Sequence, residues 1–355
     1  MVTQNLPDKQ ISLIGLCRQE IAGLLQPLNL ASYRADQIYK WIHFKNIDSF
    51  EEMTNLPLQL RRKLNEYFSL KTLRLDRQEV SADGTEKYLW LLPDGRRIES
   101  VFIPENRRNT VCISSQVGCS LGCRFCATGS MGLVRNLSSG EIVEQVLQIK
   151  RISRHPVTNI VFMGMGEPFM NYSRTINAAK ILGDSEGVAI ANKRITISTS
   201  GVVPKINQFT DEALPFGLAI SLHAPNQELR RQIMPIADKF PLPELMESVY
   251  YYMRAGKRNR VTFEYVLLEG VNDSPAEARQ LISLLSPVRC KLNIIPCNQN
   301  DLGYRAPSPE RMEQFTSAIM KAPFAVTIRK NRGEDILGAC GQLAVNVQEK
   351  TIFMK

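Results

Sequence analysis

The sequence has no uninterrupted apolar run of about 18 residues, the length that crosses a bilayer as a helix. Its first residues, MVTQNLPDKQ, lack the positively charged segment followed by an apolar stretch that marks a secretory leader. It also has no low-complexity segment and no internal repeat beyond alternating strands and helices. We therefore expect a soluble protein of the cytoplasm that contacts no membrane.

Cysteine and histidine are both scarce, with 8 cysteines and 3 histidines in 355 residues. The cysteines are unevenly spaced, unlike the disulfide lattice of a small secreted domain. In a reducing compartment, clustered thiols bind metals or take part in chemistry. The sequence therefore directs attention to where its few thiols gather.

Size and charge set two further limits. A chain of 355 residues with 44% apolar content can form one large domain and a small accessory one. The formal net charge is +9 and the isoelectric point is about 9.1, and these values favour a polyanionic partner.

Residues 1–75 carry helical periodicity in SLIGLCRQEIAGLLQPL, ASYRADQIYKWIHF and PLQLRRKLNEYF, which predicts a small helical accessory domain. Residues 76–104 alternate as EKYLWLL and RRIESVFIP around the turn PDG, which predicts a β-rich connector.

Residues 105–338 alternate between short β-branched runs and amphipathic helices. The runs are NTVCISS, VTNIVFM, RITIST, FGLAISLH, RVTFEYVLL, KLNIIP and FAVTIR, and one intervening helix opens with a capping box from Ser138 to Glu141. This alternation predicts an α/β fold with parallel strands, a partial (βα)6-type barrel. Functional groups should lie at the C-terminal ends of its strands. Residues 339–355 form a C-terminal segment.

The segment VGCSLGCRFCATG places Cys119, Cys123 and Cys126 within eight residues. Three thiolates so close can ligate three irons of one 4Fe-4S cluster and leave the fourth iron open to S-adenosylmethionine. A structural zinc site is the alternative, but it needs four ligands and no histidine lies nearby. The C-x3-C-x2-C spacing resembles the signature of the radical S-adenosylmethionine superfamily.

That resemblance assigns further residues. A G-E-P element after the second strand contacts the amino group of S-adenosylmethionine in the superfamily, which implies this role for Gly166 and Glu167. Other polar groups end consecutive strands and together suit a bound nucleoside, although each alone could cap a helix or satisfy a loop. They are Ser198, the run Ser221, Leu222 and His223, and Asn298.

Two more thiols stand apart from the cluster motif. Cys112 precedes the motif by seven residues, and Cys340 lies in a Gly-Ala-Cys-Gly loop near the C-terminus. A free cysteine is most often a small buried hydrophobe, although Cys340 would be sterically open as a nucleophile. The motifs SSQVGC, GMGEP, STSGVVP, SLHAPN and ACGQL resemble those of the RlmN/Cfr family of RNA adenine methyltransferases. The N-terminal region resembles the accessory domain of the RlmN branch, which implies that residues 1–75 bind RNA.

The family resemblance implies a mechanism in which Cys340 carries the methyl group. One S-adenosylmethionine methylates Cys340, and a second yields a 5′-deoxyadenosyl radical that takes a hydrogen atom from this methyl group. The resulting radical adds to adenine, Glu99 removes a ring proton, and Cys112 releases the product by forming a disulfide with Cys340. Two molecules of S-adenosylmethionine are used per turnover.

The implied substrates are adenine 2503 of 23S rRNA and adenine 37 of tRNA, methylated at C2 by a monomer that receives electrons from flavodoxin or ferredoxin. Three alternatives stay open: Cfr-type methylation at C8, a zinc-stabilised RNA-binding protein without catalysis, and a radical enzyme for a small molecule. About half of the basic groups should be solvated faces and the rest candidates for RNA contact: Arg61–Lys63, Arg96–Arg97, Arg107–Arg108, Arg254–Arg260 and Arg329–Arg332.

Overall fold

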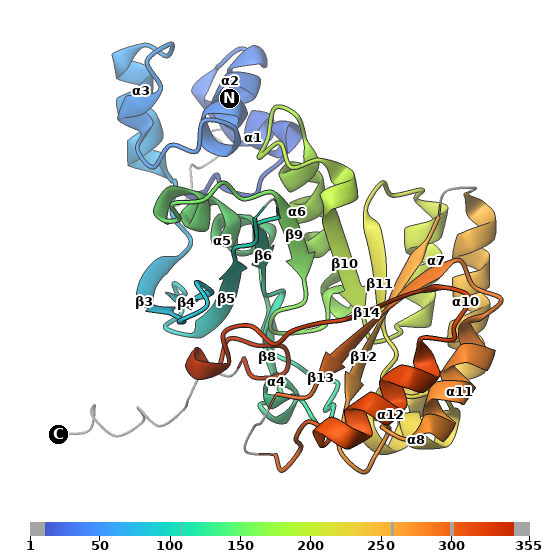
Figure 1. Cartoon of the computed structure of the whole chain (residues 1–355). Helices are drawn as coiled ribbons and strands as arrows, with labels where there is room; N and C mark the ends of the chain where they lie inside the picture. The colour runs from blue at the N-terminus through green and yellow to red at the C-terminus, as the bar shows by residue number, and fades with distance from the viewer. Residues whose placement is uncertain (1–10, 107, 257–258, 299–301, 344–355) are drawn as a thin grey trace.

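The computed structural model of the chain describes residues 11–106, 108–256, 259–298 and 302–343 (Figure 1). Parts of the expected basic groups at residues 107 and 257–258, and of the expected C-terminal segment at 344–355, lie outside these ranges. The N-terminal helices gather at one end of the molecule, and a mixed sheet with its helices forms the rest.

The three helices expected in the first 75 residues are present as α1 (Arg18–Leu25), α2 (Tyr33–His43) and α3 (Leu58–Tyr67). The first is shorter than the periodicity suggests, because Ile11–Ser12 forms strand β1, which pairs in parallel with β2 (Phe68–Ser69). This pairing joins the two ends of the helical region. The sequence pattern gave no sign of it, since each strand has two residues.

The main sheet has ten strands in the order β14-β13-β12-β11-β10-β9-β6-β5-β4-β3. Its seven parallel strands are β6 (Thr110–Cys112), β9 (Asn159–Phe162), β10 (Ile195–Thr199), β11 (Gly217–Ser221), β12 (Val261–Leu267), β13 (Cys290–Pro296) and β14 (Ala325–Ile328). These match the expected runs, and each parallel strand lies beside the next one along the chain, from β6 and β9 to β14.

Helices fill the crossovers between the parallel strands. They are α5 (Ser139–Ile152), α6 (Tyr172–Gly183), α7 (Val203–Asp211), α8 (Gln227–Ile233), α9 (Ile236–Lys239), α10 (Leu242–Ala255), α11 (Pro275–Leu285) and α12 (Pro309–Ile319). The capping box predicted at Ser138 is formed, with the Ser138 Oγ accepting from the Glu141 backbone N–H. Figure 1 shows α10, α11 and α12 gathered beside the last strands.

The sheet is open rather than closed, because β14 and β3 are its two end strands. The expected partial α/β barrel is therefore confirmed. The β-rich segment is more than a connector: β3 (Arg74–Val80), β4 (Glu86–Leu91) and β5 (Arg97–Ile103) extend the same sheet in antiparallel order. β5 pairs with β6 through Val101 and Cys112, which satisfies the backbone groups of what would otherwise be an edge strand.

Buried apolar side chains form one contiguous cluster from Leu13 to Leu343, so the N-terminal helices share a core with the sheet. The boundaries at residues 75, 104 and 338 stay a prediction. Among the described residues, no helix is both long and apolar enough to cross a membrane.

Candidate functional site at the strand ends

The three clustered cysteines lie on a tight loop between two short strands. β7 (Gln116–Gly118) pairs antiparallel with β8 (Leu133–Asn136), and α4 (Ala127–Ser130) begins directly after Cys126. Gly118 has φ +74°, and a Cβ there would lie 1.9 Å from the Gly132 carbonyl oxygen. A Cβ on Gly129 would meet the Cys123 backbone at 3.0 Å. The loop therefore needs glycine where its two arms approach each other.

The three thiols share one electrostatic environment. Burial raises the pKa of each thiol, that of Cys119 to about 12, and the charges of Cys126 and Cys119 further raise the pKa of Cys123. No three Cys, His, Asp or Glu side chains of the described residues converge on one metal position. Cysteines that each ligate a different iron of a cubane need not converge, whereas a single tetrahedral zinc requires it. The donor set therefore fits a 4Fe-4S cluster better than zinc.

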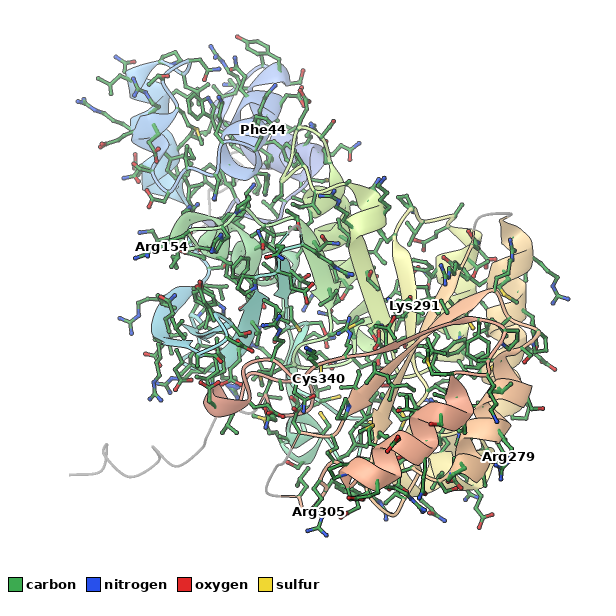
Figure 2. The ribbon with its side chains drawn as sticks, viewed as in Figure 1. Phe44, Arg154, Arg279, Lys291, Arg305 and Cys340 are labelled. Carbon is green, nitrogen blue, oxygen red and sulfur yellow. The ribbon has the colours of Figure 1, made fainter. Side chains whose placement is uncertain are left out.

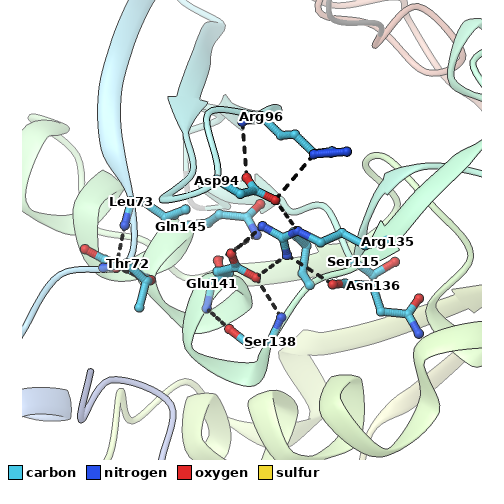
Figure 3. Close-up of polar contacts among 12 residues, drawn as sticks. Thr72, Leu73, Asp94, Arg96, Ser115, Arg135, Asn136, Ser138, Glu141 and Gln145 are labelled. Carbon is cyan, nitrogen blue, oxygen red and sulfur yellow. Dashed lines mark hydrogen bonds and ion pairs between the residues drawn. The ribbon is translucent and has the colours of Figure 1, made fainter. Parts of the chain in front are cut away.

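An ion-pair network holds the return strand of the cysteine loop in place (Figure 3). The Arg135 guanidinium on β8 donates to both Glu141 carboxylate oxygens at 2.8 and 2.9 Å, and its Nε donates to Asp94 at 2.6 Å. Glu141 also accepts from the Ser138 backbone N–H at 2.8 Å. One guanidinium thus connects the turn after β4, strand β8 and the start of α5.

Gly166 and Glu167 follow β9, as expected, and Glu167 is buried among backbone donors. Its carboxylate accepts from the Phe169 N–H at 3.0 Å and from the Ser200 N–H at 2.8 Å. Its own N–H donates to the Gln116 side chain at 2.8 Å. Gly166 has φ +98°, and a Cβ there would lie 2.5 Å from the Gln116 Cβ. These bonds fix the ends of β7, β9 and β10 relative to one another.

Ser198 and Ser221 end neighbouring strands, and their Oγ atoms lie 3.5 Å apart. Leu222 is fully buried, and its backbone N–H and carbonyl are bonded to Glu264 and Arg230. The structure therefore brings the two serines together, whereas both backbone polar groups of Leu222 already have hydrogen-bond partners.

His223 stands in the left-handed region with φ +56°. Its Nδ1 accepts from the Val266 N–H at 3.0 Å, and its ring contacts the edge of Phe125 at 4.9 Å between centroids. Burial and the nearby Arg230 lower the pKa of His223 to about 3. The ring is therefore neutral, with its proton on Nε2.

Asn298 follows β13 and lies beside the C-terminal loop. Its Nδ2 donates to the Cys340 carbonyl oxygen at 3.2 Å, while its buried Oδ1 has no hydrogen-bond partner in the described part of the chain. A buried acceptor without a partner costs free energy unless a ligand donates to it. Asn298 thus supplies the orphaned polar atom that a bound cosubstrate would satisfy.

One cavity of about 420 Å³ brings together thiols from distant parts of the chain. Cys112 on β6, Cys126 of the cysteine loop and Cys340 of the C-terminal loop all line it, as does Asn298. Cys112 is buried, whereas Cys340 is exposed, near the middle of the molecule in Figure 2. Burial raises the pKa of Cys112, and the charge of Cys340 adds to this shift, as expected for two thiols that line one cavity.

Glu99 lies on β5, two residues before Val101, which lines the cavity. It shares a strand face with Val101 and Ile103, both of which line the cavity. Its carboxylate is buried and lies 3.7 Å from the Lys87 Nζ. The structure thus places Glu99 on the cavity side of the sheet, paired with a lysine.

Sequence reasoning missed Arg230, a fully buried arginine on α8. Its Nη2 donates to the Ser200 carbonyl at 2.6 Å and its Nε to the Leu222 carbonyl at 3.3 Å, so it holds two strand-end loops. Burial lowers the pKa of Arg230 to about 10, while the charge of Cys123 raises it. Its neighbour Arg231 is exposed. In the sequence, only the three-residue spacing from Arg230 to the buried Ile233 indicates that Arg230, and not Arg231, lies on the buried face of the helix.

An open parallel sheet with a three-cysteine loop at its strand ends defines a radical S-adenosylmethionine enzyme. In agreement, residues 113–282 match the model of the radical SAM superfamily, and residues 11–70 match that of the ribosomal RNA large subunit methyltransferase N-terminal domain. Enzymes of this superfamily use a 4Fe-4S cluster and S-adenosylmethionine, and the donor set and the orphaned Asn298 acceptor fit both groups.

The chain belongs to the RlmN family. It is 41% identical to the dual-specificity RNA methyltransferase RlmN of Alcanivorax borkumensis, over 97% of this chain and 93% of the relative. It is 45% identical to RlmN of Rhodospirillum rubrum, over 94% of this chain and 80% of that protein. A solved radical SAM methyltransferase from Sphaerobacter thermophilus is 42% identical, with a TM-score of 0.89 over 94% of this chain and 99% of that one.

Proposed function

We propose that the chain methylates C2 of adenine in RNA, at adenine 2503 of 23S rRNA and adenine 37 of tRNA. The observation that supports this most directly is the shared cavity wall of Cys112 and Cys340, with the cluster-loop residue Cys126 beside them. C2 of adenine is an electron-poor carbon that cannot attack a sulfonium methyl group, so a radical route through a protein-bound methyl group is needed.

The cysteine loop would hold the cluster through Cys119, Cys123 and Cys126. When bound, this cluster supplies the electron, received from flavodoxin or ferredoxin, that cleaves S-adenosylmethionine to a 5′-deoxyadenosyl radical. The carbonyl side of the Asn298 amide, Ser198, Ser221 and the His223 Nε2–H offer hydrogen-bonding groups for the cosubstrate. The buried Glu167 carboxylate would receive its amino group beside Gly166.

Cys340 would carry the methyl group, because its side chain is exposed in the cavity and can accept a methyl group from S-adenosylmethionine. After hydrogen abstraction and addition to adenine, the ring radical would give up one electron to the oxidised cluster, and Glu99 would take the proton from the substituted ring carbon. The Cys112 thiolate then attacks the Cys340 sulfur. A disulfide forms, the sulfur–methylene bond breaks, and its electron pair with a proton completes the methyl group on adenine. A reductant returns the disulfide to two thiols.

RNA binding is supported by the cations that line the same cavity. They are Arg108, Lys291, Arg329, Lys330 and Arg332. A cavity wall with this many cations favours the binding of phosphate groups. The target base would have to leave its stack to reach the thiols. We further propose that the N-terminal helices help to hold the RNA and that a single copy of the chain suffices, since all the named groups come from one chain.

The match of residues 11–70 to the N-terminal domain model favours methylation at C2 over the Cfr-type reaction at C8. Mass spectrometry of nuclease-digested RNA after anaerobic turnover separates 2-methyladenosine from 8-methyladenosine. We expect 2-methyladenosine alone. Formation of 8-methyladenosine would contradict the proposed position, and colourless anaerobic protein with zinc and no iron would contradict the radical reaction altogether.

A further inference from the structure

A row of polar residues crosses the cavity side of the last three strands. Glu264 on β12 is in register with Asn293 on β13, which is in register with Thr327 on β14. Asn293 and Thr327 line the cavity. Residues in register on neighbouring parallel strands point to the same face, so Glu264 faces the inside of the partial barrel as well.

Glu264 is a carboxylate almost without solvent, at 4% exposure. One of its oxygens accepts from the Asn293 Nδ2 at 2.9 Å, and the other has no hydrogen-bond partner among the described residues. Burial raises the pKa of Glu264, and the charge of Arg329 opposes this most strongly. A buried carboxylate of this kind is retained at acceptable cost when a cation lies near it.

Arg329 lines the same cavity as the two thiols, and its charge is the one that acts most strongly on Glu264. It follows β14, where its backbone N–H donates to the Ile294 carbonyl at 2.8 Å, and it lines the cavity with Cys112 and Cys340. Glu264 is its strongest charged neighbour, followed by the two cysteines. Desolvation raises the pKa of both thiols, and the charge of Arg329 opposes this shift on each of them.

In the proposed reaction, Cys112 releases the protein–RNA adduct, and this step needs a negative charge on its sulfur. Burial of Cys112 disfavours that charge. Cys112 must attack as a thiolate, but burial raises the pKa of its thiol and a negatively charged Cys340 would raise it further. A backbone hydrogen bond from Met163 works in the opposite direction, as Arg329 does. The other ionisable groups of the described residues that line this cavity are Glu105, Arg108, Cys126, Lys291, Lys330 and Arg332.

We propose that Arg329 stabilises the negative charge on the Cys112 sulfur as this residue resolves the protein–RNA adduct. The inference rests on the proposed function and adds one positioning residue, Arg329, to it. No bond beyond those already described forms or breaks, because Arg329 stays protonated throughout and acts through its charge alone.

The adduct provides the first test. After a single anaerobic turnover, its decay is followed on denaturing gels over a range of pH. We expect the adduct of Arg329→Gln to decay at least about tenfold more slowly near neutral pH, the change in thiolate fraction that one pKa unit produces. The difference should narrow as pH rises. Arg329→Lys should restore decay to within a few-fold, because a point charge suffices.

Alkylation gives a readout that does not depend on turnover. The pH midpoint of Cys112 modification by iodoacetamide, mapped by peptide mass spectrometry in the anaerobic holoenzyme, should rise in Arg329→Gln. It should stay unchanged in Lys321→Gln, which removes an exposed cation just before β14. Equal midpoints in wild type and Arg329→Gln would overturn the proposal.

Glu264→Gln tests the charge effect in the opposite direction. Its removal leaves the positive charge of Arg329 less opposed, so the Cys112 midpoint should fall. An unchanged or raised midpoint would contradict action through the charge of Arg329. Failure of the proposed function would look different, because wild-type enzyme and Cys112→Ala would then form no protein–RNA adduct at all.

Discussion

The side-chain amide of Asn298 donates a hydrogen bond to the backbone carbonyl of Cys340 at 3.2 Å. This bond connects the end of β13 to the C-terminal loop, and the Ala127 N–H donates to the Gly341 carbonyl at 2.8 Å from the cluster side. The Thr128 hydroxyl donates to the Leu343 carbonyl at 2.5 Å. The loop that carries Cys340 is thus held against both the sheet and the cysteine loop.

Removal of each cavity thiol should block the reaction at a different step. Cys112→Ala should accumulate a covalent protein–RNA adduct, because no thiolate can release it. Cys340→Ala should abolish methylation while keeping the iron and sulfide content of the wild type. Denaturing gels and metal analysis after anaerobic turnover measure both, with Cys17→Ser as the control. Normal turnover by Cys112→Ala would remove the proposed role.

Glycine at position 118 should be required for cluster assembly. A Cβ there would lie 1.9 Å from the Gly132 carbonyl oxygen, at a φ of +74° that side chains disfavour. Gly118→Ala should therefore lose most of the iron and the visible absorption of the cluster. Gly23→Ala is the matched control, since nothing lies within 4 Å of its Cβ in α1, and it should stabilise the fold by about 0.5–1 kcal/mol. Full iron content in Gly118→Ala would contradict the tight loop.

The Arg135–Glu141 pair should stabilise the fold more than a surface ion pair does. The Glu141 side chain is 8% exposed, so Glu141→Gln should lower the free energy of unfolding by about 1–2 kcal/mol. This range already allows for the weaker interaction that results because Arg135 is partly exposed to solvent. Arg231→Gln breaks a pair between side chains 59% and 56% exposed and should cost less than about 1 kcal/mol. Urea unfolding of the anaerobic holoenzyme measures both, and equal effects would contradict the anchoring role.

Buried His43 should make stability depend on pH. Its Nε2 accepts from the Gly15 N–H at 3.1 Å, and burial lowers the pKa of the ring to about 3 from an ordinary value of 6.5. Below pH 6.5 the His43 ring binds a proton in the unfolded chain but not in the folded chain. Stability is therefore fully present above about pH 6.5 and falls by about 1.4 kcal/mol per pH unit as pH decreases towards 3.

Buried His223 contributes a second slope of the same sign and similar size, so His43→Gln should remove about half of the combined slope of the two histidines. Urea unfolding at several pH values between 5 and 8 measures it, with His155→Gln, an exposed position, as the control. An unchanged slope in His43→Gln would show that its ring is protonated in the folded chain.

Cations of the N-terminal helices should contribute to RNA binding. Because the core is continuous, deleting residues 1–75 would expose apolar surface, and Arg62→Gln with Lys63→Gln is the cleaner test. We expect weaker binding and a slope of log affinity against log salt reduced by about 1 for each lost phosphate contact. Arg279→Gln, at the opposite end of the molecule in Figure 2, is the control. Unchanged binding by the double variant would contradict RNA contact there.

Local patterns predicted much of the fold. The seven parallel strands and the capping box at Ser138 follow from short-range periodicity and capping chemistry, which act over a few residues and can be read directly. The β3–β5 extension and the β1–β2 pair were missed, because pairing depends on which distant strand supplies a partner edge. Arg230 was missed because its burial depends on the loops it bonds.

By itself the sequence determined the alternation of strands and helices, the three-cysteine motif and the strand ends on which polar residues fall, since these depend on covalent order and local spacing. The tertiary structure decided that Cys112 and Cys340 share a cavity, that Arg329 lines it, and that His43 is buried and neutral. Those outcomes depend on long-range packing, which sets both the distance between remote side chains and their access to water.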